Sequence, residues 1–116
     1  MKDSILTSVK KMLGPEEAYE HFDPDLIIHI NTVLATLTEL GVGPEDGFVI
    51  EDKSATWREF IGNSKLLKMV PTYVYLKVRL AFDPPTTAAV LESFERQAKE
   101  YEWRINDVAE RERSKS

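Results

Sequence analysis

Few side chains in this 116-residue chain could carry out acid–base, metal or nucleophilic chemistry. The sequence has no cysteine, which excludes disulfides, thiolate nucleophiles, iron–sulfur clusters and cysteine-bearing zinc sites. Each of the two histidines follows an acid at a spacing of four residues, in the pairs Glu17/His21 and Asp25/His29. Two ligands do not hold a metal ion, so we interpret both pairs as weak pairs on a helix surface.

Motifs for binding phosphate or activating a serine are missing from the sequence. It contains no Gly-x-Gly-x-x-Gly segment, no Walker-type Gly-Lys-Ser/Thr loop and no Gly-x-Ser-x-Gly turn. Its paired carboxylates lie in expected loops, where solvated acids are the rule; the pairs are Glu16/Glu17, Glu45/Asp46 and Glu51/Asp52. The sequence therefore predicts a protein that is not an enzyme and that uses no metal or cofactor.

The charged residues are unevenly distributed along the chain. The net charge is −5, but residues 14–63 carry eleven acids against two bases, whereas residues 64–82 carry four bases and no acid. Tight binding to nucleic acid would need a basic stripe that follows the phosphates, so we expect none. The four bases either lie at the edges of a buried helix or, for Lys77 and Arg79, contact the acidic region of a neighbouring copy. The second arrangement, repeated about an axis, closes a ring.

The composition fits one folded domain. Hydrophobic residues make up 42% of the chain and charged residues 30%, which is typical of a compact domain rather than a disordered segment. No stretch approaches the roughly 20 apolar residues that span a membrane, and the first residues do not resemble a signal peptide. We expect a soluble intracellular protein with a single helical domain at residues 1–109 and a flexible tail at residues 110–116.

Hydrophobic spacing predicts a mainly α fold, a small bundle of about four helices. The first helix covers residues 3–13. The second begins at Asp23, its expected N-cap, and ends at Gly41, where Val42 is expected to fold back onto Leu37 in a Schellman-type cap. Residues 43–63 follow as a structured loop or a short β-hairpin, because turn-forming residues surround a short β-favouring run.

The second half of the chain carries the two remaining helices. Residues 64–82 are apolar nearly all round, which predicts a central helix; Pro71 lies inside them, so this helix either begins near Pro71 or kinks there. The last helix, residues 87–111, shows an a/d seam from Leu91 to Val108. It is long enough for its end to project, and Trp103 lies off the seam, where it would be exposed to contact another chain.

Several segments are similar to a known protein family. They are FDPDLIIHIN (residues 22–31), LGVGP (40–44), IEDK (50–53), TW (56–57), YLKVRLAFDPP (75–85) and EYEWRI (100–105). Together they resemble the head-tail connector proteins, also called head completion or adaptor proteins, of tailed phages and prophages. The resemblance covers most of residues 3–106, and segment 75–85 is its most specific part.

The resemblance implies a small helical adaptor without catalytic residues. Such proteins form a homo-oligomeric ring, here expected to be a dodecamer, below the portal at the capsid vertex. The ring would join the DNA-filled head to the next tail-side connector or stopper protein and leave a channel through which the genome passes without sequence-specific binding. The implied location is the head-tail interface of the virion, and the bacterial cytoplasm during assembly, with no membrane contact.

Three surfaces of such a ring can be assigned as hypotheses. For the portal contact we expect an aromatic anchor with charged partners: Trp103, Arg104, Arg111 and Arg113. Truncation after Asn106 should then abolish docking and spare the fold. For the subunit interface we expect Lys77, Arg79 and Trp57. For the channel wall we expect Glu45, Asp46, Glu51 and Asp52, because a wall that repels phosphate lets DNA slide.

Two other functions are compatible with the residues. One is a small regulatory or scaffold protein that acts as a dimer through the seam from Leu91 to Val108; the stoichiometry of the protein would distinguish it from a ring. The other is a weak nucleic-acid binder that uses the lysines of residues 64–82. Such a protein would bind DNA with a steep dependence on salt.

Overall fold

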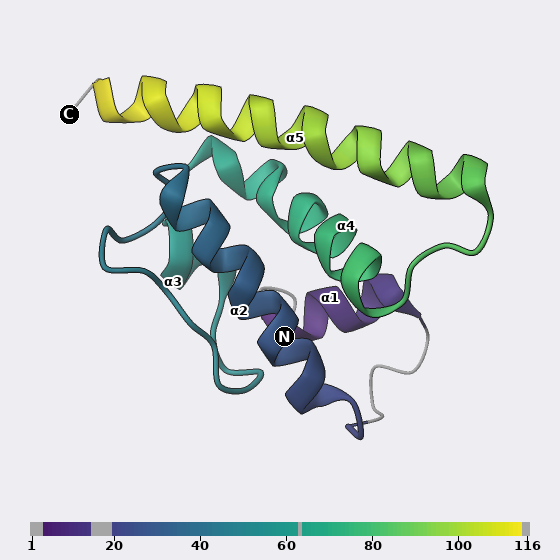
Figure 1. Cartoon of the computed structure of the whole chain (residues 1–116). Coiled ribbons are helices and arrows are strands. Elements are labelled where there is room, and N and C mark those ends of the chain that lie inside the picture. Colours follow the sequence, from purple (N-terminus) through teal and green to yellow (C-terminus); the bar gives the residue numbers. More distant parts are fainter. Residues whose placement is uncertain (1–3, 15–19, 63, 115–116) are drawn as a thin grey trace.

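The computed structural model describes residues 4–14, 20–62 and 64–114. Within these ranges the chain forms five α-helices and one 3-10 helix and no β-strand (Figure 1). The elements are α1 (Ile5–Leu13), α2 (Asp23–Glu39), α3 (Trp57–Ile61), η1 (Lys65–Lys68), α4 (Val70–Phe82) and α5 (Ala88–Ser114). The prediction of a mainly α fold is confirmed.

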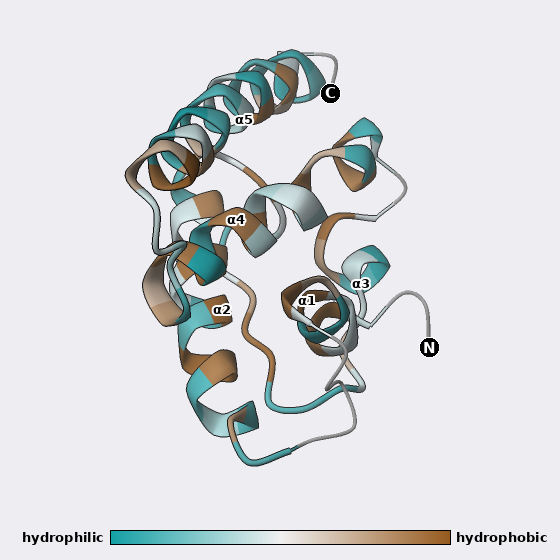
Figure 2. Cartoon of the chain, turned by 90° about the vertical axis from the view of Figure 1, so that its right-hand side faces the viewer, coloured by the Kyte–Doolittle hydropathy of each residue, from teal (hydrophilic) through white to brown (hydrophobic). Residues whose placement is uncertain are grey.

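Helix α4 lies at the centre of the fold. It packs against α5 on one side and against α1 and α2 on the other (Figure 1). Tyr73, Val74 and Val78 are completely buried, as expected for a helix that is apolar nearly all round. Figure 2 shows the hydrophobic parts of the helices turned toward this interior.

The two ends of α2 differ in how well the sequence predicts them. At the C-terminus, Gly41 has a φ of 90° and the Val42 N–H donates to the Leu37 carbonyl at 2.9 Å, which is the predicted Schellman cap. At the N-terminus, the prediction that Asp23 caps the helix was wrong, because Asp23 lies inside it and no side chain caps it. The Asp23 carboxylate instead lies 2.8 Å from Lys10 Nζ, so an ion pair joins α2 to α1.

The connection between α2 and α3 is a loop and not a β-hairpin. A side chain of α2 forms hydrogen bonds with the backbone of this loop. Asn31 donates to the Ile50 carbonyl at 3.0 Å and accepts from the Ile50 N–H at 2.8 Å. The Asn31 amide thus replaces the neighbouring strand that a hairpin would supply. Phe48 packs against Phe60, with ring centroids 5.2 Å apart, and Ile50 is buried, whereas Val49 between them is exposed.

The starts of α3 and α4 follow from local sequence. Thr56 and Glu59 form a capping box at the start of α3, a Thr-x-x-Glu pattern readable from sequence. Pro71 lies in the first turn of α4, where its missing N–H costs no helical hydrogen bond. Of the two alternatives for Pro71, the structure shows a helix that begins beside it, after η1.

Helix α5 spans the molecule. Its 27 residues give about 40 Å at 1.5 Å per residue, and the longest dimension of the molecule is 41 Å. In Figure 1 its first turns extend past α4, and Ala88, Ala89 and Val90 are exposed. The end that projects is therefore the N-terminal end of this helix.

The C-terminal end of α5 packs against the rest of the fold. Ala109 is buried, and the Ser64 hydroxyl donates to the Glu112 carboxylate at 2.7 Å. Residues 110–114, assigned to a flexible tail from the sequence, continue the helix. The mobility of this last segment stays a prediction.

Candidate interaction surfaces

The solvent-facing side of α5 carries most of the residues predicted to bind the portal. Trp103 is 70% exposed, more than any other large apolar side chain in the described chain. Arg104 pairs with Glu100 at 2.8 Å, and Arg111 pairs with Asp107 at 2.7 Å. Both pairs join side chains one helical turn apart, so the guanidinium groups are held on a helix that α4 supports.

Arg113 is not part of that side of α5. Its guanidinium covers Gly41, where the Cβ of any other residue would lie 2.7 Å from Arg113 Nη1. Gly41 also has a positive φ, a backbone conformation that favours glycine at this position. Arg113 therefore joins α5 to the end of α2. Truncation after Asn106 would remove this contact and buried Ala109, so we no longer expect it to spare the fold.

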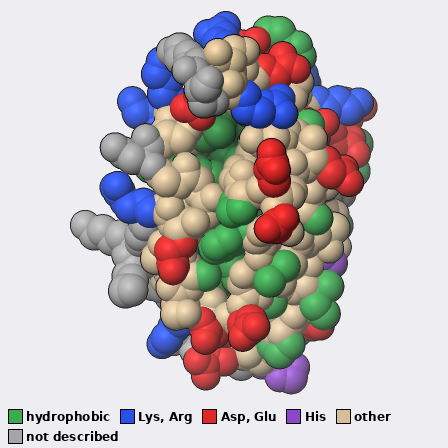
Figure 3. Space-filling view, turned by 90° about the vertical axis from the view of Figure 1, so that its left-hand side faces the viewer, with side chains coloured by type: hydrophobic (Ala, Val, Ile, Leu, Met, Phe, Trp, Pro, Cys, Tyr) green, Lys and Arg blue, Asp and Glu red, His purple; other side chains and the backbone are tan. Residues whose placement is uncertain are grey.

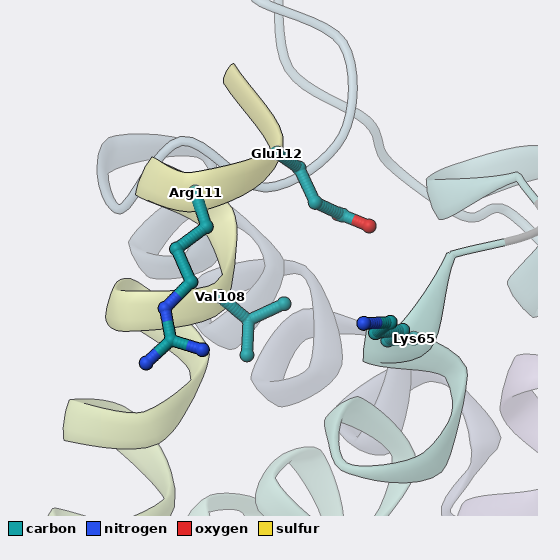
Figure 4. A pocket seen from close by; sticks show the side chains of 4 residues that line it. All are labelled: Lys65, Val108, Arg111 and Glu112. Atoms are coloured by element: carbon teal, nitrogen blue, oxygen red, sulfur yellow. The ribbon is translucent and has the colours of Figure 1, made fainter. Parts of the chain in front are cut away.

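A groove lies between η1 and the C-terminal end of α5 (Figure 4). Its volume is about 320 Å³, and it is lined by Lys65, Val108, Arg111 and Glu112. In Figure 4, Glu112 points toward the segment that carries Lys65, and Arg111 extends on the other side of Val108. The Glu112 carboxylate is held by Ser64, whereas Lys65 makes no ion pair within the described residues. Sequence reasoning missed this groove because its walls come from separate elements.

The three residues predicted for a subunit interface lie in different surroundings. Trp57 is 3% exposed and its indole N–H donates to Ser8 Oγ at 3.2 Å, so the structure places it in the core. Arg79 donates to the Tyr75 hydroxyl at 3.2 Å and lies 5.6 Å from the centre of the Phe94 ring, so it joins α4 to α5. Lys77 lines an open groove between α4 and α5.

The four acids predicted for a channel wall are all exposed on the loop between α2 and α3. Glu45 and Asp46 occupy the tip of a turn closed by the Gly47 N–H and the Pro44 carbonyl at 3.0 Å. Glu51 and Asp52 follow buried Ile50. Hydrogen bonds from the Ser54 hydroxyl and N–H hold the pKa of Asp52 below its usual value. Each acid pair thus lies at a turn that presents its side chains to solvent.

The face formed by this loop and the end of α5 carries charges of both signs. In Figure 3, basic side chains are most frequent near the upper edge, where acidic ones lie among them, and acidic side chains predominate below, beside exposed hydrophobic ones. The acidic lower part agrees with the sequence, in which residues 14–63 carry eleven acids against two bases.

One buried polar pair has a structural role. The Tyr73 hydroxyl donates to Glu102 at 2.7 Å and links α4 to α5. Burial, together with this hydrogen bond to a carboxylate, raises the pKa of Tyr73 well above its usual value. Tyr73 therefore stays a neutral hydrogen-bond donor at any physiological pH.

The histidines and acids do not converge on a metal site within the residues that the structure describes. His29 packs against Phe82, with ring centroids 5.9 Å apart, and His21 is exposed. None of the described helices is long and apolar enough to cross a membrane. What the described chain offers are surfaces: an aromatic and charged helix side, two grooves beside lysines, and an acidic loop.

These features define a small, mainly helical protein whose surface carries an exposed tryptophan, an acidic loop and grooves. The sequence matches the family described as phage connector protein over residues 5–112. The match runs from the start of α1 nearly to the end of α5, and the chain belongs to this family. Comparison with curated proteins and with solved structures gave no significant match.

Proposed function

We propose that this chain is the adaptor subunit of a head-tail connector. Copies form a ring, a dodecamer in the arrangement we favour, below the portal, and the ring joins the DNA-filled head to a tail-side connector or stopper protein. The ring leaves a channel for the genome and acts in the virion after assembly in the bacterial cytoplasm. The observation that carries this proposal is membership of the phage connector family over residues 5–112.

The experiment that tests it is a mass measurement. Light scattering or native mass spectrometry is applied to the protein alone and then mixed with the cognate portal protein. We expect ring-sized assemblies, or many copies bound to each portal. A stable dimer that ignores the portal would contradict the proposal.

The portal contact uses the solvent-facing side of α5, with Trp103 as its anchor. An exposed tryptophan on a rigid helix is typical of an interface residue that contributes much of the binding energy. Trp103→Ala should weaken portal binding at least tenfold and leave the melting temperature unchanged. Val90→Ala is the matched control, because Val90 is also an exposed apolar residue of α5, at 44%. Equal effects of the two variants would remove Trp103 from the contact.

The channel wall is formed by the acidic loop. Neutralising three of its acids (Glu45→Gln, Glu51→Gln and Asp52→Asn) should slow genome ejection from assembled particles, since DNA then adheres to the wall; Asp46 is left unchanged because it also lines the groove beside α2. The control variant combines Glu92→Gln with Glu110→Gln, which removes acids from α5 instead. Normal ejection by the loop variant would contradict this assignment.

The function needs no catalysis, in keeping with a family of structural proteins. The alternative function was a regulatory dimer that forms through the seam of the last helix. We do not favour it, because residues of this seam pack against α4 within the monomer. Ala98 and Ile105 of this seam are buried where α5 packs on α4.

Subunits of the ring meet head to tail, the acidic region of one copy against bases of residues 64–82 of the next. Such a contact uses two different surfaces of each copy, and it closes into a ring when the rotation between copies allows. Lys77 stays a candidate for it; Trp57 and Arg79 do not, since both are engaged within the monomer.

A further inference from the structure

The solvent-facing side of α2 has no charge over most of its length. No acidic or basic side chain other than His29 occurs between Asp25 and Glu39, although a surface helix normally carries charged residues on its outer face. Ile28 is 64% exposed, and Val49 of the adjoining loop is 67% exposed. We call the exposed residues Ile28, Thr32, Ala35 and Val49 the α2 patch.

Covering the α2 patch with another protein surface costs little free energy, because its polar groups are already hydrogen-bonded. The Thr32 hydroxyl donates to the Ile28 carbonyl at 3.0 Å, and the neighbouring Thr38 hydroxyl donates to the Leu34 carbonyl at 3.0 Å. Because both hydroxyl donors are satisfied within the helix, a protein surface can cover the patch without leaving them unpaired.

The patch adjoins a groove with an acidic surround. The groove lies between α2 and the loop, has a volume of about 400 Å³, and is lined in part by Ala35, Phe48, Val49 and Asp46. Asp25 and Glu39 stand at the two ends of the uncharged stretch of α2. None of the three acids makes an ion pair with a residue that the structure describes. The surface therefore suits a partner that presents apolar contact flanked by cations.

The groove between η1 and α5 presents those features on the same chain. Lys65 and Lys68 are exposed and make no ion pair within the described residues. Val108 gives the groove an apolar wall, and Glu112 is held by Ser64. The groove beside Lys77 suits the α2 patch less well, because it also contains Glu95 and Glu102, which balance its lysines.

We propose that the α2 patch of one copy binds the η1–α5 groove of the next copy, with Lys65 and Lys68 opposite Glu39 and Asp46. The proposal rests on the proposed connector function and names the surfaces that its ring contact uses. A like-charged arrangement, patch against patch, is disfavoured because it would bring the acids of both copies together.

The placement of the two surfaces fits a head-to-tail contact. Figure 2 shows α2 and α3 at opposite edges of the molecule, and η1 packs against α3 and α5. The two surfaces share no residue, so one copy can use both at once. Each added copy then leaves one free surface of each kind until the ring closes.

Charge reversal tests the pairing. Lys65→Glu/Lys68→Glu and Glu39→Lys/Asp46→Lys should each raise the protein concentration needed for half-assembly on portal rings at least tenfold. Combining all four changes should restore assembly, because the charges are exchanged and not removed. Lys11→Glu is the matched control, because Lys11 is an exposed lysine of α1 outside both surfaces, and it should change assembly less than threefold. Melting curves show which variants are folded.

Cysteine cross-linking tests the contact itself. Because the sequence has no native cysteine, only the introduced cysteines can react. The double variant Ala35→Cys/Lys65→Cys, treated with a bismaleimide on assembled rings, should give a ladder of covalent oligomers. Each single variant alone should stay monomeric on a denaturing gel.

The outcomes separate this inference from the proposed function. Rings that form on the portal without a ladder, and without a response to charge reversal, would overturn the surface assignment and leave the connector function standing. Cross-linked dimers from Ala35→Cys alone would show patch against patch and also overturn it. Failure of the unmodified protein to assemble with the portal would contradict the connector function, and this inference with it.

Discussion

Helices α2 and α5 bury similar faces and expose opposite ones. Both pack apolar side chains against α4, and Ile30 of α2 and Ile105 of α5 are equally inaccessible. Outside, α5 alternates acids and bases that pair across single turns, whereas α2 exposes an uncharged surface between Asp25 and Glu39. A helix that meets only water gains from such charges. The difference supports the proposal that a neighbouring copy covers the outer side of α2, whereas the portal contact proposed for α5 centres on Trp103.

The two helices also differ in how their outer sides are attached to their surroundings. On the outer side of α5, side chains four residues apart form ion pairs within the helix. The outer side of α2 instead binds a distant segment, because Asn31 fixes Ile50 across the loop. A change on α5 is therefore expected to stay local, and a change on α2 to alter the loop as well.

The largest effect on folding should come from the buried faces, where the two helices ought to behave alike. Ile30→Ala and Ile105→Ala should each lower the free energy of unfolding by about 2–5 kcal/mol, from lost burial and a residual cavity. Trp103→Ala, two residues from Ile105, should change it by no more than about 0.5 kcal/mol. Urea unfolding measures all three. A cost for Ile105→Ala far below that for Ile30→Ala would show that α5 is only loosely attached.

The next effect concerns the loop that α2 holds. Asn31→Ala removes both hydrogen bonds to the Ile50 backbone and should cost about 1–3 kcal/mol, since a buried residue's N–H and carbonyl lose their partners. Limited proteolysis should then cut within residues 43–55 faster than in the unmodified protein. Thr38→Ala is the control on the same helix, because its hydroxyl bonds only within α2. Unchanged proteolysis would mean that Phe48 and Ile50 hold the loop without Asn31.

Features set by neighbouring residues could be predicted from the sequence. The Schellman cap needed only Gly41 and the apolar residues around it, and the start and most of the length of α5 followed from its 3-4 spacing, although its last turn had been assigned to a tail. The exposure of Trp103 followed from its position off that seam, and the structure confirms it; its role as an anchor stays a prediction.

Features made by residues far apart in sequence could not be predicted. The Asn31 clamp spans 19 positions, and the hydrogen bond from Ser64 to Glu112 spans 48. Spacing within one element says nothing about which distant partner an amide or a carboxylate finds. For the same reason Trp57 and Arg79 looked available for an interface, and the fold uses both internally.

A smaller effect depends on pH and tests the attachment of α5 to α4. Tyr73→Phe removes the hydrogen bond to Glu102 and should cost about 1 kcal/mol at pH 8. The pKa of Tyr73 is raised in the folded state, so its contribution is complete below the usual tyrosine pKa of about 10 and declines as pH rises above it. The difference between the two proteins in urea unfolding should therefore shrink between pH 8 and pH 10.5. A constant difference would contradict the raised pKa.

The smallest effect should come from the outer side of α5. Glu100→Gln breaks the pair with Arg104, whose side chains are 57% and 55% exposed, and an exposed pair one turn apart contributes only about 0.3–0.5 kcal/mol. The loss should vanish in 1 M salt, where charges are screened within about 3 Å.

A matched substitution on α2, Ala35→Glu, should leave unfolding nearly unchanged but block assembly on portal rings, which light scattering detects. If Ala35→Glu assembles as well as Glu100→Gln, the uncharged side of α2 is an ordinary solvent surface and the contrast between the two helices has no bearing on assembly.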